Sequence, residues 1–72
     1  MNTLQALYDS EINFELSCFW DGGFDWKLGD PVNGYRSKGN AETFEQAVEA
    51  LAQAACQCYP ASKFAQERRL VA

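Results

Sequence analysis

The chain has 72 residues, of which 47% are hydrophobic, and it carries six basic and ten acidic side chains with no histidine. This length suits one small domain, and the net charge of −4 argues against nucleic-acid binding, which depends largely on lysine and arginine contacts to phosphate. No stretch reaches the roughly 20 apolar residues of a membrane span, and no basic-then-apolar leader opens the chain. We therefore expect a soluble, cytoplasmic protein without a membrane partner.

The first predicted element is a short helix that begins after a capping Thr3. Leu4, Leu7 and Tyr8 recur at the spacing of one helix face, so we expect all three to point inward. A helix of this length is not stable by itself, and it must pack on the rest of the chain.

Two amphipathic strands joined by a tight turn are predicted next. Residues 12–20 alternate apolar and polar side chains, and residues 24–28 do the same. Between them lies Asp21-Gly22-Gly23, whose two glycines supply the positive φ angles of a hairpin turn. The alternation predicts one buried sheet face beneath a helix. The residues on this face are Ile12, Phe14, Leu16, Cys18, Trp20, Phe24, Trp26 and Leu28.

Phe19 departs from this pattern because it falls on the polar face of the predicted sheet. Exposed aromatic side chains are typical of interfaces, so Phe19 is a candidate contact with a partner or a second copy. The alternative is that the amino-terminal helix or the carboxy-terminal tail covers it. Tyr35 is the second candidate interface residue, and it opens a short third strand over residues 35–38 whose charges suit a sheet edge.

Residues 43–58 have the strongest helical pattern in the chain. Thr43 is a predicted N-cap, and Gln46 can complete a capping box with it. Val48 and Leu51 are predicted core residues on an apolar stripe that repeats at helical spacing, and the stripe consists of Phe44, Ala47, Val48, Leu51, Ala54, Ala55 and Cys58. This helix ends at Tyr59-Pro60, because proline disfavours helical geometry in the residue before it.

The end of the chain leaves two interpretations open. Ser62 can cap a final short helix, or residues 63–72 form a frayed tail. With either ending, the sequence predicts one α+β domain over residues 1–72, in the order α-β-β-β-α. Its three-stranded antiparallel sheet spans roughly residues 11–38, one long helix packs on one face, and short helices lie at the termini.

The three cysteines, Cys18, Cys56 and Cys58, are an odd number and do not form a disulfide framework. Residues two apart on a helix point about 200° apart, so Cys56 and Cys58 do not converge on one metal ion. Cys58 belongs to the apolar stripe, whereas Cys56 faces away from it and is the predicted exposed thiol. We expect no metal and no cofactor.

Catalytic chemistry has no clear basis in this sequence. There is no histidine, no Gly-x-Ser-x-Gly turn and no phosphate-binding glycine loop ahead of a helix. Asp21 and Asp30 are natural turn residues, and Asp25 lies on the polar face of its strand. We therefore expect a protein that is not an enzyme.

One family resemblance covers roughly residues 12–58. The order of strand, Asp-Gly-Gly-aromatic turn, strand, Asn-Gly-Tyr loop, short strand and helix resembles the amino-terminal domain of HicB-type antitoxins. The matching positions are Asp21, Gly22, Gly23, Phe24, Asp30, Pro31, Gly34, Gly39, Thr43, Glu45 and Ala47. Two extra residues separate Gly39 from Thr43, and no DNA-binding helix-turn-helix or ribbon follows, so operator binding is not implied. The chain also looks like short uncharacterised bacterial proteins.

Two hypotheses for function follow. The first is a small non-catalytic interaction module that associates with itself, as a homodimer, or with another protein. The alternative, implied by the resemblance, is a nucleic-acid-binding or toxin-neutralising domain related to HicB-type antitoxins, and the acidic charge makes nucleic acid the less favoured partner.

Overall fold

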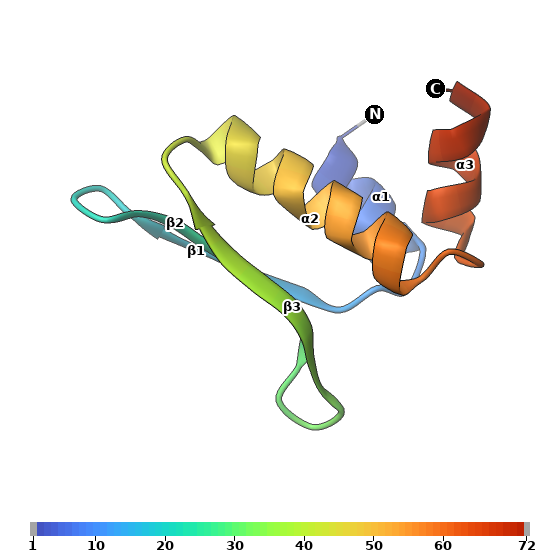
Figure 1. Cartoon of the computed structure of the whole chain (residues 1–72), viewed down its shortest axis with the longest axis horizontal. Coiled ribbons are helices and arrows are strands. Elements are labelled where there is room, and N and C mark those ends of the chain that lie inside the picture. Colours follow the sequence, from blue (N-terminus) through green and yellow to red (C-terminus); the bar gives the residue numbers. More distant parts are fainter. Residues whose placement is uncertain (1, 72) are drawn as a thin grey trace.

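The computed structural model describes residues 2–71, and the side chains of residues 69–71 lie outside that description. The predicted α+β order is confirmed, with a three-stranded antiparallel sheet in the order β1-β2-β3. Figure 1 shows α1 and α2 on one side of the sheet and α3 beyond the end of α2. The elements are α1 (Thr3–Asp9), β1 (Phe14–Phe19), β2 (Gly23–Asp30), β3 (Gly34–Ala41), α2 (Phe44–Cys58) and α3 (Lys63–Val71).

Strand β3 is longer than the sequence predicts. Its pairing with β2 continues as far as Phe24 opposite Ala41. Gly39 lies opposite Trp26, and a Cβ atom at Gly39 would come within 2.7 Å of the Trp26 ring. The second half of β3 packs against the Trp26 indole through a glycine. It therefore has no alternation of apolar and polar side chains from which the sequence could predict a strand.

The start of α2 confirms the predicted cap. The Gln46 backbone N–H donates to Thr43 Oγ1 at 3.1 Å. The Gln46 side chain reaches back as expected, but its Oε1 accepts from the Glu42 N–H at 3.3 Å, one residue before the cap. Both bonds satisfy amide groups that have no partner inside the helix.

We expect Thr43→Ala to lower the free energy of unfolding by about 0.5–2 kcal/mol, because the Gln46 amide loses its acceptor. Thr43→Asp is the matched control, since aspartate also caps and its charge suits the positive end of the helix dipole. Urea denaturation of both variants checks this. Equal losses in the two variants would show that Thr43 has a role other than capping.

Helix α1 differs from its prediction at both ends. Asn2, not Thr3, is the N-cap, and its Oδ1 accepts from the Leu4 N–H at 2.8 Å. Leu7 is fully buried as predicted, but Tyr8 is 73% exposed. Because α1 is only seven residues long and packs on α2, a single narrow stripe of it faces inward.

The end of α1 is closed by a Schellman motif. The Ile12 N–H donates to the Leu7 carbonyl at 3.1 Å, and the Glu11 N–H donates to the Tyr8 carbonyl at 3.0 Å. Such a motif needs a left-handed residue, and Glu11 takes that position with φ of 61°. Ile12 and Leu7 both belong to the hydrophobic core, which is the apolar contact that accompanies this motif.

We expect Glu11→Gly to raise the free energy of unfolding by about 0.5–1 kcal/mol. Glycine adopts the left-handed conformation without the Cβ penalty, and this relief exceeds its greater freedom in the unfolded chain. Ser10→Gly is the control, because Ser10 has φ of −90° and gains nothing from glycine. Thermal unfolding of both variants checks this, and stabilisation by Ser10→Gly alone would contradict it.

The hydrophobic core draws side chains from all three helices and from β2. Leu7, Leu28 and Leu51 are the largest fully buried side chains, so the prediction for Leu51 is confirmed. Leu16 and Trp26 pack against the core while remaining partly exposed, and Val48 is only half-buried. The core lies further toward the carboxyl end of α2 than predicted, because α3 adds Phe64 and Ala65 there. The remaining buried hydrophobic residues are Ile12, Ala47, Ala52, Ala54 and Ala55.

Residues 63–71 form helix α3, and residue 72, which the predicted tail also included, lies outside the described residues. Ser62 acts as the predicted cap, with its Oγ accepting from the Ala65 N–H at 3.1 Å. Phe64 is buried in the core, which ties α3 to α2.

Candidate functional site

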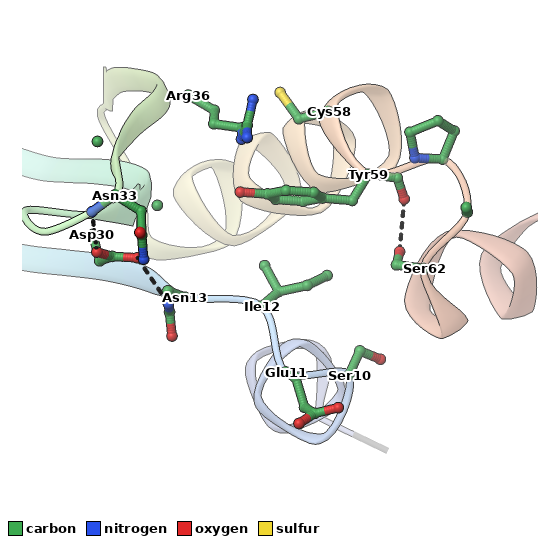
Figure 2. A pocket seen from close by; sticks show the side chains of 14 residues that line it. Ser10, Glu11, Ile12, Asn13, Asp30, Asn33, Arg36, Cys58, Tyr59 and Ser62 are labelled. Carbon is green, nitrogen blue, oxygen red and sulfur yellow. Dashed lines mark hydrogen bonds between the residues drawn. The ribbon is translucent and has the colours of Figure 1, made fainter.

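A cavity of about 550 Å³ lies where three connections meet at the end of the sheet nearest α3. These are the α1–β1 connection, the β2–β3 hairpin and the α2–α3 connection. Figure 2 shows the side chains that line it. Concave regions of this size are where small-molecule sites usually lie, so this cavity is the candidate ligand site.

Asp30 organises the hairpin side of this cavity. Its Oδ1 accepts from the backbone N–H groups of Val32 at 2.9 Å and Asn33 at 2.7 Å. Its Oδ2 accepts from Asn13 Nδ2 at 2.9 Å and from Asn33 Nδ2 at 3.3 Å. The Asn33 backbone bond, followed by the Asn13 bond, lowers the pKa of Asp30 below its usual value. The carboxylate is fully engaged in holding the turn, as the sequence predicted for a turn residue.

Tyr59 fills the middle of the cavity. Figure 2 shows its ring between Arg36 and Ile12. The Arg36 guanidinium lies 5.6 Å from the ring centroid, a cation–π contact, and Ser62 Oγ donates to the Tyr59 carbonyl at 2.7 Å. Arg36, which lines the cavity, thus lies over an aromatic ring of the same chain. The cation–π contact joins β3 to the α2–α3 connection, and the Ser62 hydrogen bond lies within that connection.

The face of the sheet opposite the helices carries a small polar cluster around Tyr35. The Tyr35 hydroxyl donates to Glu15 Oε2, and Lys27 Nζ lies 5.3 Å from the Tyr35 ring centroid. The hydrogen bond to Glu15, followed by burial, raises the pKa of Tyr35 above its usual value. Tyr35, a predicted interface residue, is therefore exposed but already in contact with two neighbours.

The other end of the sheet has an exposed group of aromatic side chains. Trp20 is 98% exposed, Phe19 is 49% exposed and Phe44 is 46% exposed. The Phe44 ring meets the Phe24 ring edge-on, with centroids 6.0 Å apart. Figure 1 shows that the β1–β2 hairpin and the start of α2 lie at this same end of the molecule. We call Phe19, Trp20, Phe24 and Phe44 the aromatic end.

The prediction that Trp20 is buried beneath the helix is wrong. Strand β1 ends at Phe19, so Trp20 is the first residue of the turn and leaves the alternation of the strand. The turn also needs only one glycine with positive φ, Gly23 at 85°, rather than two. Phe19 remains exposed because α1 and α2 lie on the opposite side of the sheet, so the alternative that a terminal segment covers it is not realised.

The cysteines are arranged differently from the prediction. Cys18 is exposed although it shares the helix-facing side of the sheet, because it pairs with Phe24 near the end of the sheet and away from the core. Cys56 is half-buried and packs against the core, as does Cys58. The core cluster against which Cys56 packs includes Leu7 of α1 and Phe64 of α3.

We expect Cys18 to react with a maleimide faster than Cys56 or Cys58 in the folded protein, because reaction requires access to the sulfur atom. Mass spectrometry of peptides after timed labelling checks the order. Labelling in urea is the control, in which the three rates should converge. Faster labelling of Cys56 would contradict the packing described here.

Among residues 2–71, no three His, Cys, Asp or Glu side chains gather as a metal-binding group. None of the helices in that part of the chain is long and apolar enough to cross a membrane. Comparison with known proteins gives no match to this chain among protein-family models, curated proteins or solved structures.

Proposed function

We propose that this chain is a small non-catalytic interaction module that associates with a second copy of itself through its aromatic end. The observation that carries the proposal is Trp20, an indole that is 98% exposed at the tip of a hairpin. Tryptophan is enriched among the residues that dominate binding energy at interfaces. Phe19, at the end of β1, and Phe44, at the start of α2, are further exposed aromatic side chains of the aromatic end.

The charges near this surface favour a protein partner over a phosphate-bearing one. Asp21 follows Trp20 directly in the turn, and Asp25 lies on the adjacent strand, where Asn40 Nδ2 donates to its Oδ1 at 2.6 Å. Nucleic acids are bound mainly by cationic side chains, and acidic residues around exposed rings oppose that mode. This supports a protein partner, including a second copy of the chain, over the nucleic-acid-binding alternative.

The cavity near α3 supports a non-catalytic assignment. Asp30 is committed to the turn and Arg36 to the Tyr59 ring, so both side chains have a structural role. Their contacts explain why these residue types stand at these positions without any reaction being involved.

Light scattering over a wide range of concentration tests this proposal. We expect the mass to rise from 8.1 kDa at low concentration toward twice that value. Trp20→Ala should weaken association about tenfold or more, the range for removal of an aromatic side chain that dominates an interface. Val32→Ala is the matched control, because Val32 is 89% exposed at the tip of the other hairpin. A monomer at every concentration, or equal effects of the two substitutions, would overturn the proposal.

A further inference from the structure

Strand β1 lies at one edge of the sheet, and it pairs only with β2 among the described residues. The Gly29 N–H donates to the Asn13 carbonyl at 2.8 Å, just before β1 begins. In an antiparallel pair, residues whose backbone groups face the neighbour alternate with residues whose groups face away. With Phe14 opposite Leu28, the backbone N–H and C=O groups that face away from β2 belong to Phe14, Leu16 and Cys18.

The two edges of this sheet differ in how well they are protected. Strand β3 carries Arg36 and Lys38, and charged side chains on an edge discourage pairing with another chain. Strand β1 has the sequence FELSCF, with Glu15 as its one charged residue, no proline and a regular register with β2. The β1 edge is therefore the one suited to accept another strand.

We propose that β1 pairs antiparallel with β1 of a second copy, about a two-fold axis at Leu16, to form a continuous six-stranded sheet. This inference rests on the proposed self-association and assigns its pairing element. Only the register centred on Leu16 matches all three outward-facing residues with one another, since Phe14 then meets the partner's Cys18 and Leu16 meets the partner's Leu16. A C2 interface needs this kind of self-complementary surface.

The charges of β1 also favour this register. Centred on Leu16, the pairing sets Glu15 opposite the partner's Ser17. A shift that centred the pairing on Glu15 would set two carboxylates directly opposite each other, which destabilises a strand pair. Centring on Ser17 would leave Phe14 opposite the partner's Trp20, which lies in the turn and outside the strand.

In this register, Trp20 of the aromatic end becomes part of the interface. Trp20 comes directly after the last residue of β1, so this register brings it beside the partner's connection between α1 and β1. Two tryptophan side chains then enter the contact, one from each copy, and together they bury about 300–500 Å². That is a substantial share of the ~1,200 Å² at which specific interfaces begin, and the strand pair supplies further area.

Disulfide formation between cysteine variants tests the register. A mixture of Glu15→Cys and Ser17→Cys chains should give a mixed disulfide between positions 15 and 17 under mild oxidation. Directly opposed residues in antiparallel strands have the Cα separation that a disulfide requires. Peptide mapping identifies the linked positions and separates them from links through the native cysteines. Each variant alone should form no link between its two copies of the new cysteine.

The outcomes separate this inference from the proposed function. A dimeric mass with the mixed 15–17 link supports both. A dimeric mass with a 15–15 or 17–17 link, or with no link at these positions, overturns the Leu16-centred pairing and leaves self-association standing. A monomer at every concentration overturns both. Cys18→Lys provides a second readout, because a lysine on the β1 edge should weaken association at least tenfold while Asn40→Lys on the β3 edge should not.

Discussion

Replacement of Leu51 by alanine should lower the free energy of unfolding by about 2–5 kcal/mol. Leu51 is fully buried on α2, in the core that contains Leu7 and Leu28. Its truncation removes apolar contacts from all these neighbours and leaves a cavity that the packed helices can only partly close. For a chain of 72 residues, this should shift the melting temperature down by about 8 °C or more.

Thermal and urea unfolding measure this effect, and Val48→Ala is the matched control. Val48 lies one turn earlier on the same helix but is only half-buried, so its truncation should cost about 1 kcal/mol. Equal losses at the two positions would show that the core does not centre on Leu51. An unchanged melting temperature for Leu51→Ala would show that α2 presents a different face to the sheet.

The second large effect is expected at Gly29. We predict that Gly29→Ala lowers the free energy of unfolding by about 3 kcal/mol or more. Gly29 has φ of 118°, a conformation that side chains with a Cβ rarely adopt. An added Cβ would also lie 2.5 Å from the Gly34 carbonyl oxygen and 2.9 Å from the Tyr35 Cα, both of them backbone atoms. The register shift between Leu28 and Gly29 produces this close approach of β3.

Gly34 provides the control for this prediction. It also has a positive φ, 93°, but a Cβ there would meet nothing within 4 Å. Gly34→Ala should therefore cost about 1–2 kcal/mol from backbone conformation alone. Urea unfolding compares the two variants. If Gly29→Ala cost no more than Gly34→Ala, the close contact between the strands would not be present in solution.

The sequence was sufficient to predict the elements whose signals are local. The cap at Thr43 depends only on residues within one helical turn of it, and so does the end of α2 at Tyr59. The sequence predicts both correctly. The alternation of β2 likewise placed Leu28 and Trp26 on the helix-facing side. Such features depend on residue chemistry and spacing alone.

The features that sequence analysis missed depend on contacts between distant elements. Cys18 and Trp20 share an apolar alternation with Leu16, yet only Leu16 lies close enough to the core to be covered. How far the helix layer extends over the sheet is set by the packing of α1 and α3 on α2, which periodicity does not reveal. The cavity around Tyr59 was missed for a similar reason, because it joins three connections that are far apart in sequence.

The core and the aromatic end occupy different regions of a thin molecule, whose extents are 36 × 29 × 17 Å. Trp20 and Phe19 are not members of the core, so changes at these positions leave its packing intact. The proposed contact surface and the core can therefore change independently of each other in evolution. Descendants of this chain could acquire new binding preferences at the hairpin while the leucines beneath α2 continue to maintain the same architecture.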